Sequence, residues 1–113
     1  MKTIDKEHLA DMQKSREDLV VLEVLGEDDY KRYHLPGAIN VPLDEGFAKS
    51  IQEAVPEKDR PIVVYCTDEE CPASGKAARW MESLGYTDVY DYTGGKKDWQ
   101  ATGGKLVAGP TPG

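Results

Sequence analysis

Two short apolar runs constrain the fold of this chain more than any other feature. Residues 19–25 read Leu-Val-Val-Leu-Glu-Val-Leu, and residues 61–65 read Pro-Ile-Val-Val-Tyr. Both runs are rich in Val and nearly continuous, which is typical of strands that are covered on both faces. Such strands occur in parallel sheets with helices packed on each side, so the runs predict an α/β fold.

The rest of the chain alternates helical and extended patterns around these two runs. Asp5 can cap a first helix that carries Leu9 and Met12 on one face. Further helices are expected over residues 27–33, 44–54 and 74–84, and a last one around Trp99; further strands are expected at residues 39–41 and 89–92. Strands that alternate with helices form βα units, in which ligands bind beyond the carboxyl ends of the strands.

Length and charge restrict the class of protein. The chain has 113 residues, enough for one domain, which we place at residues 1–108, followed by a flexible Pro/Gly tail at residues 109–113. The formal net charge is -7, which argues against a nucleic-acid partner. Residues 1–7 are charged and unlike a signal peptide, and no apolar run is long enough for a membrane helix, so we expect a cytoplasmic protein without a membrane partner.

Two cysteines, Cys66 and Cys71, are the candidate reactive groups. Cys66 directly follows the second apolar run and precedes a predicted helix, where loop amides and the positive helix end favour a thiolate. The alternative is that Cys66 is a small buried residue without a chemical role. A zinc site is not expected, because only His8 and His34 complement the cysteines as donors.

The segment after Cys66 is acidic. Residues 67–73 include Asp68, Glu69 and Glu70 but neither Lys nor Arg. A carboxylate at contact distance would oppose a thiolate by about 1 kcal/mol in water, comparable to the roughly 0.3–1 kcal/mol that a helix end offers. The acids therefore cancel the helix effect if they point inward, and have little effect if they point to solvent.

Five segments, in order along the chain, match motifs of one known protein family. Residues 22–25 (Leu-Glu-Val-Leu) match a first strand motif that usually ends Asp-Val-Arg, and residues 33–42 (Tyr-His-Leu-Pro-Gly-Ala-Ile-Asn-Val-Pro) match the signature Gly-His-Ile-Pro-Gly-Ala-x-Asn-Ile-Pro. The other segments are Val-Val-Tyr-Cys at 63–66, the Ala-Ala, Leu-Gly-Tyr and Val-Tyr motifs within 77–90, and Gly-Gly-Lys-Lys-Asp-Trp at 94–99. Together these segments resemble the rhodanese family.

This resemblance implies both a fold and an activity. The fold is a central, mostly parallel five-stranded sheet with helices on both faces. The activity is that of a sulfurtransferase without a cofactor, in which Cys66 is catalytic and carries sulfur as a persulfide between a small sulfur donor and a thiol acceptor, including a thiol-bearing protein. The resemblance also implies that a loop binds the persulfide, here formed by Thr67, Asp68, Glu69, Glu70, Cys71, Pro72 and Ala73.

The chain departs from the family pattern at the loop. The family loop usually ends in an Arg, but this loop has none and is two residues longer, and Leu25 replaces the Arg of the first motif. We therefore expect thiosulfate to be a poor donor, because no loop cation holds its sulfonate. Lys76 and Arg79 on the following helix are candidates to replace this cation, but we expect them to belong to a solvated helix face instead. A phosphatase is not expected, because Pro72 stands where related phosphatases have an oxyanion-binding Arg.

Two alternatives to a simple sulfurtransferase remain open. Cys71 is either a resolving thiol that forms a disulfide with Cys66 in a redox or sulfur-relay protein, or a half-buried residue at a helix start. A bridge requires a curved loop, because six extended residues would hold the cysteines about 17 Å apart. The other alternative is a non-catalytic binding module. His34 is expected to be structural, and the aromatic residues Tyr65, Trp80, Tyr86 and Trp99 to belong to the core or its rim.

Overall fold

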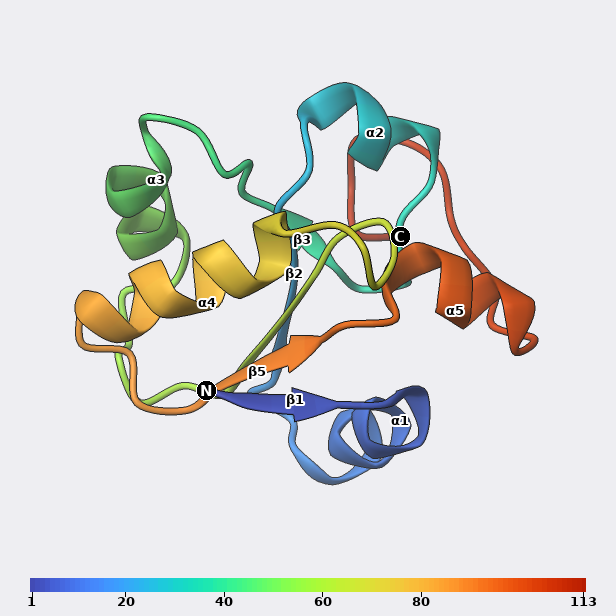
Figure 1. Ribbon diagram of the computed structural model, residues 1–113, viewed down its shortest axis with the longest axis horizontal. Helices are drawn as coiled ribbons and strands as arrows, with labels where there is room; N and C mark the ends of the chain where they lie inside the picture. Colours follow the sequence, from blue (N-terminus) through green and yellow to red (C-terminus); the bar gives the residue numbers. More distant parts are fainter.

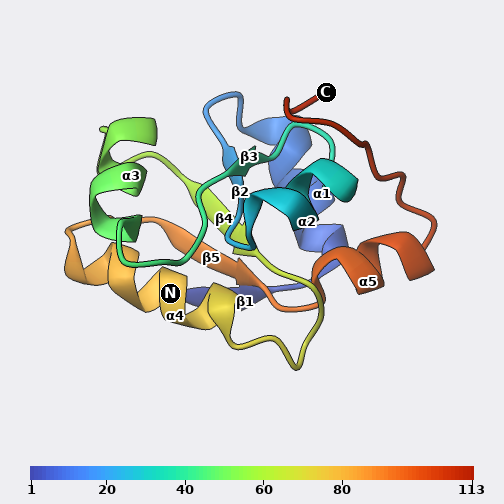
Figure 2. The ribbon, with the colours of Figure 1, turned by 90° about the horizontal axis from the view of Figure 1, so that it is seen from above.

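All five strands of the central sheet run parallel, in the order β1-β5-β4-β2-β3. Figure 1 shows the sheet among its helices, and the strand labels in Figure 2 follow this order from bottom to top. The computed structural model describes residues 1–113. The strands are β1 (Lys2–Ile4), β2 (Val20–Glu23), β3 (Ile39–Asn40), β4 (Ile62–Tyr65) and β5 (Val89–Tyr92). The predicted five-stranded parallel sheet is confirmed, and β4, which precedes Cys66, lies at its centre.

Five helices cover the two faces of the sheet. They are α1 (Lys6–Ser15), α2 (Glu27–Arg32), α3 (Phe47–Ala54), α4 (Ala73–Ser83) and α5 (Gly95–Ala101). In Figure 2, α3 and α4 lie on one side of the sheet, and α1, α2 and α5 lie on the other. None of these helices has the length and apolar character that a membrane span requires.

Alternation of side chains along the strands explains why the two apolar runs are continuous. In β2, Val20 and Leu22 pack in the core beneath α3 and α4, whereas Val21 packs in the core beneath α1 and α2. In β4, Ile62 and Val64 point to the first core, with the other residues of the strand on the second. Both faces are therefore buried, which favours apolar residues along these strands; burial of each aliphatic side chain contributes roughly 1.5–3 kcal/mol. Glu23, at the end of β2, is the one charged residue in the two strands.

The observed elements differ from the predicted ones at their ends. Strand β1 was not located in the sequence, because only Ile4 of its three residues is buried and the pattern is too short to detect. Helix α3 begins at Phe47 rather than at Asp44, since the Asp44 carboxylate accepts a hydrogen bond from the amide of Gly46 (2.9 Å) and closes a turn there. Helix α4 begins one residue earlier than expected, at Ala73.

The C-terminal segment returns to the turn that follows α2. Val107 pairs with His34 in an isolated bridge, and the amide of Gly109 donates to the carbonyl of Lys31 (2.8 Å). The amide of Gly37 donates to the carbonyl of Pro112 (2.9 Å), so residues 109–113 are attached at two points. The flexibility of this tail, and the domain boundary at residue 108, stay predictions that limited proteolysis would test.

Candidate active site

Cys66 lies directly beyond the carboxyl end of the central strand β4. Its side chain belongs to the core beneath α3 and α4, and the residue is only 1% exposed. The loop of residues 66–72 connects it to the first turn of α4, which begins at Ala73 after an N-cap of Pro72 with no side-chain capping bond. The free amides of this helix end carry partial positive charge, which favours an anionic sulfur nearby.

The start of α5 holds the backbone at Cys66. The amide of Lys96 donates to the carbonyl of Cys66 (3.1 Å), and the amide of Lys97 donates to that of Thr67 (2.9 Å). Gly95 makes this approach possible: its φ is 63°, and a Cβ there would lie 2.4 Å from the Cys66 carbonyl oxygen. The second glycine of the Gly-Gly motif is therefore required by contact with the cysteine's own backbone.

Asp68 shapes the acidic loop. Its side chain accepts a hydrogen bond from the amide of Glu70 (3.1 Å), and its carbonyl accepts one from the amide of Cys71 (3.2 Å). Glu69 and Glu70 are exposed, so these two carboxylates lie in solvent, where water weakens their effect on a thiolate. The amides of residues 70 and 71 are used within the loop, which leaves those of other loop residues for a bound sulfur.

Cys66 and Cys71 are joined in a disulfide. Their Cα atoms are 6.4 Å apart, within the roughly 4.4–6.8 Å that a bridge requires. The loop therefore curves back on itself, as a disulfide between these two cysteines requires. The turn at Asp68 provides this curvature. Because Cys66 is almost fully buried and Cys71 is partly exposed, Cys71 is the more accessible sulfur of the pair. Whether Cys71 acts as a resolving thiol stays a prediction.

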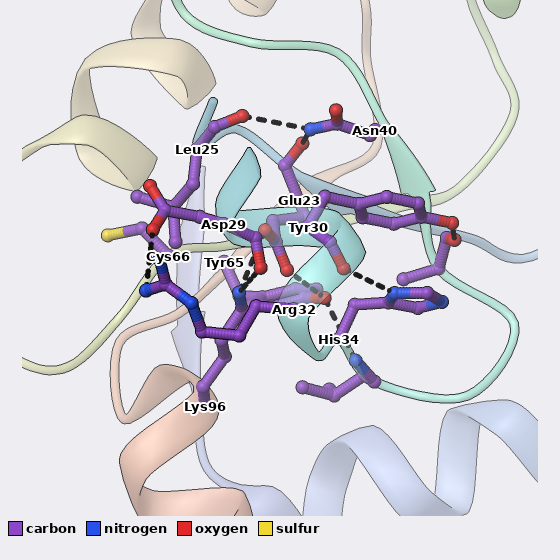
Figure 3. Close-up of polar contacts among 12 residues, drawn as sticks. Glu23, Leu25, Asp29, Tyr30, Arg32, His34, Asn40, Tyr65, Cys66 and Lys96 are labelled. Atoms are coloured by element: carbon purple, nitrogen blue, oxygen red, sulfur yellow. Dashed lines mark hydrogen bonds and ion pairs between the residues drawn. The ribbon is translucent and has the colours of Figure 1, made fainter. Parts of the chain in front are cut away.

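A buried ion pair beneath the loop was not predicted from the sequence. Lys96 Nζ lies 2.9 Å from Glu23 Oε2, and both side chains are at most 5% exposed. The Tyr65 hydroxyl donates to the other carboxylate oxygen of Glu23 (2.8 Å), and Lys96 also donates to the carbonyl of Asp29 (3.0 Å), as Figure 3 shows. The pair connects the carboxyl end of β2 to α5 and so fixes the helix that holds Cys66.

Burial dominates the electrostatics of this cluster. It raises the pKa of Glu23 above its ordinary value, while Lys96 and Tyr65 act in the opposite direction. Burial also raises the pKa of Tyr65, so this phenol stays protonated and acts as a hydrogen-bond donor to Glu23. The only signal in the sequence was an ionisable residue, Glu23, inside an apolar run.

The other residues singled out in the sequence have structural positions. His34 is buried, with Nδ1 2.8 Å from the carbonyl of Tyr30 and its ring stacked on that residue. Tyr65 and Tyr86 are buried in the cores, Trp99 packs against one of them, and Trp80 is exposed. These positions confirm the expected core and rim roles of Tyr65, Tyr86 and Trp99, whereas Trp80 packs in neither core and the expectation was wrong for it.

Arg79 and Lys76 of α4 differ in their relation to the loop. Arg79 lines a cavity of about 250 Å³ together with Cys71. A second hollow, on the side of Trp80, is lined by both Arg79 and Lys76, but Lys76 does not line the cavity beside Cys71. The ion pairs and the arginine side-chain hydrogen bonds of the structure do not include Arg79. Of the two helix cations considered from the sequence, Arg79 is therefore the one beside the loop.

Comparison with known proteins yields a consistent set of relatives. Residues 5–102 match the family described as "Rhodanese-like domain". The chain is 38% identical over 77 residues to the thiosulfate sulfurtransferase PspE of Escherichia coli, covering 68% of this chain and 70% of the relative. It is 30% identical over 109 residues to the uncharacterized protein YqhL of Bacillus subtilis, covering 96% of this chain and 77% of that protein.

A solved structure shares the same fold. It is a thiosulfate sulfurtransferase from Pseudomonas aeruginosa, with a TM-score of 0.84 and 29% sequence identity. The match covers 96% of this chain but 20% of the other, so this chain corresponds to one part of that larger protein.

Proposed function

This chain belongs to the rhodanese-like family, and we propose that it is a sulfurtransferase that carries sulfane sulfur as a persulfide on Cys66. The observation that carries the proposal is the position of Cys66, between the central strand and the first turn of α4. PspE and the Pseudomonas aeruginosa neighbour, both described as thiosulfate sulfurtransferases, support the reaction class. The proposed partners are a small sulfur donor and a thiol acceptor, including thiol-bearing proteins, in the cytoplasm.

The proposed reaction has two displacements at sulfur. The Cys66 thiolate attacks the sulfane sulfur of the donor, the donor's sulfur bond breaks, and the leaving group departs with the electron pair. The acceptor thiolate then attacks the outer sulfur of the Cys66 persulfide and releases Cys66 as a thiolate. The helix end and the free loop amides favour the Cys66 thiolate and the anionic Cys66 persulfide. The hydrogen bond from the Lys96 amide to the Cys66 carbonyl, which the absence of a side chain at Gly95 allows, keeps the Cys66 backbone in place during both steps.

The charge around the site favours one class of donor. Asp68, Glu69 and Glu70 lie in the loop, and the formal net charge of the chain is -7. A dianion such as thiosulfate is repelled by this field, whereas an uncharged polysulfide or a thiol-bound persulfide is repelled less. We propose that the donor is an uncharged polysulfide or a thiol-bound persulfide.

The disulfide supports a second candidate, a sulfur-releasing redox protein. In that reaction the Cys71 thiolate attacks the inner sulfur of the Cys66 persulfide and hydrosulfide leaves with the electron pair. The product is the Cys66–Cys71 disulfide, for which the loop already has the required curvature. This reaction needs the same persulfide, so both candidates depend on Cys66.

Two cysteine variants test the proposal. Each protein is first reduced and then freed of the reductant. The persulfide of a small thiol serves as donor and cyanide as acceptor, and the thiocyanate formed is measured. Cys66→Ser should lose the catalysed rate, whereas Cys71→Ser should retain it and should no longer release sulfide in the absence of an acceptor. Catalysis that persists in Cys66→Ser would contradict the proposal, and sulfide release that persists in Cys71→Ser would contradict the second candidate.

A further inference from the structure

The cavity beside Cys71 is lined by a buried acid, one of whose oxygen atoms has no hydrogen-bond partner. The cavity has a volume of about 250 Å³, smaller than the roughly 300–1,000 Å³ of sites for drug-sized ligands, so it fits a small molecule. Asp91 of β5 lines it and is 4% exposed, and its Oδ1 atom has no hydrogen-bond partner. A buried polar group of this kind is costly unless a ligand or a proton satisfies it.

A positive group faces the same space. A Cβ on Gly75 would lie 3.6 Å from Arg79 Nη1 and 3.6 Å from Asp91 Oδ2, so Gly75 forms the floor between the two charged groups. Burial raises the pKa of Asp91, while Ser74 and Arg79 act in the opposite direction. The cavity therefore presents the buried acid Asp91, a second and exposed acid, Glu69, at its rim, one basic group and a sulfur atom, that of Cys71.

We propose that this cavity binds a small thiol that carries both an ammonium and a carboxylate group, as an α-amino acid thiol does. The ammonium group would pair with Asp91 and the carboxylate with Arg79, which leaves the thiol beside Cys71. The inference rests on the proposed function, because the bound thiol is what returns Cys66 from the disulfide to the thiolate that accepts sulfur.

The reduction consists of two thiol–disulfide exchanges. The ligand thiolate attacks the sulfur of Cys71, a mixed disulfide forms, the Cys66–Cys71 bond breaks, and Cys66 leaves with the electron pair as a thiolate. A second ligand thiolate then attacks the ligand sulfur of the mixed disulfide, releasing the ligand's own disulfide and the Cys71 thiolate. Two thiols are oxidised and the protein gains two electrons. Attack on Cys71 is favoured because Cys66 is buried, and because the N-terminus of α4 favours the Cys66 thiolate as leaving group.

Four thiols test the recognition on the oxidised chain of residues 1–113. Cysteine has both charged groups, cysteamine only the ammonium, 3-mercaptopropionate only the carboxylate, and 2-mercaptoethanol neither. Rates of disulfide reduction are followed by acid quench, alkylation and mass spectrometry, and are expressed per concentration of thiolate so that differences in thiol pKa do not enter. Cysteine should saturate and exceed each of the other three by about tenfold or more, as expected for a charged hydrogen bond.

Variants assign each group of the ligand to its partner. Asp91→Asn should slow cysteine and cysteamine but not the two thiols without an ammonium group. Arg79→Gln should slow cysteine and 3-mercaptopropionate, whereas Lys76→Gln, which removes a cation from the same helix outside the cavity, should change none of the four rates. Gly75→Ala places a methyl group between the two charged residues and should slow cysteine most. This variant tests the cavity even if the Asp91 variant fails to fold, because 3.6 Å is an ordinary contact and Ala favours helix by about 1 kcal/mol over Gly.

Three results would overturn the inference. They are rates that follow intrinsic thiolate reactivity without saturation, selectivity that persists in Gly75→Ala, and a trapped mixed disulfide on Cys66 instead of Cys71. No sulfur donor enters these measurements. A failure to form a persulfide would therefore overturn the proposed function and leave the cavity's selectivity as an independent result.

Discussion

Replacement of Lys96 by Met removes one partner of the buried ion pair and should destabilise the protein strongly. Lys96 is 5% and Glu23 0% exposed in their side chains, and their charged atoms are 2.9 Å apart. Without the lysine, the carboxylate stays buried with Tyr65 as its one remaining side-chain donor. Removal of one partner from such a pair costs roughly 3–5 kcal/mol, a large share of the roughly 5–15 kcal/mol that stabilises a typical domain.

The size of this effect can be measured by urea and thermal unfolding of the oxidised chain. A loss of 1 kcal/mol lowers the melting temperature by roughly 4–8 °C in a small domain, so Lys96→Met should melt at least about 12 °C below the parent. Lys97→Met is the matched control. It alters the next residue of α5, whose side chain is exposed, and should change the free energy of unfolding by less than about 0.5 kcal/mol.

The stability lost in Lys96→Met should be smaller at low pH than at high pH. The folded pKa of Glu23 already lies above its ordinary value and rises further without Lys96. At pH values between the pKa of Glu23 in the unfolded chain and its higher pKa in the folded chain, Glu23 is protonated when folded and ionised when unfolded. The free energy of unfolding therefore falls as pH increases through this range. Lys96→Met should therefore be less impaired near pH 5 than near pH 8.

A second substitution separates the ion pair from other roles of the lysine. Glu23→Gln combined with Lys96→Met removes both charges and should recover part of the loss seen in Lys96→Met alone. A cost below about 1 kcal/mol for Lys96→Met, equal at both pH values, would show that the pair does not hold α5 against β2.

Three further predictions concern the loop and its supports. Thiosulfate turnover should be slow and should increase with added salt, because salt screens the repulsion by the acidic loop; fast turnover that is insensitive to salt would show that a cation reaches the site. Gly95→Ala should lower the free energy of unfolding by about 2 kcal/mol or more, since its φ is 63° and its Cβ would overlap the Cys66 carbonyl; an unchanged urea midpoint would refute this contact. In the reduced chain at neutral pH, limiting alkylation should label Cys66 before the more exposed Cys71, because the N-terminus of α4 favours the Cys66 thiolate. The reverse order would contradict the assignment of the nucleophile.

The sheet could be predicted from the sequence where burial on both faces leaves a local signal. Strands β2 and β4 have this signal, and it placed Cys66 correctly at the carboxyl end of the central strand. Strand β1 does not have it, because its three residues gain their role only from pairing with β5, far along the chain. The start of α3 was wrong for a similar reason, since the Asp44 turn competes with the helix.

The site could be predicted only in part. The position of the cysteine followed from local pattern, but its supports come from distant segments. Lys96 and Glu23 are brought together by the fold, and neither has a neighbour in sequence that signals the pair. The spacing of Cys66 and Cys71 allowed either a curved or a bulging loop, and the hydrogen bonds made by Asp68 select the curved one. The chemical role of Cys66 stays a prediction.

The most direct test of that role is the intact mass of the Cys71→Ser variant after reduction and treatment with a small persulfide donor, followed by peptide mapping. This variant cannot resolve the persulfide internally. The account predicts a gain equal to the mass of one sulfur atom, located on the peptide that contains Cys66 and removed by a thiol acceptor. An unchanged mass, or a sulfur located on any other residue, would contradict it.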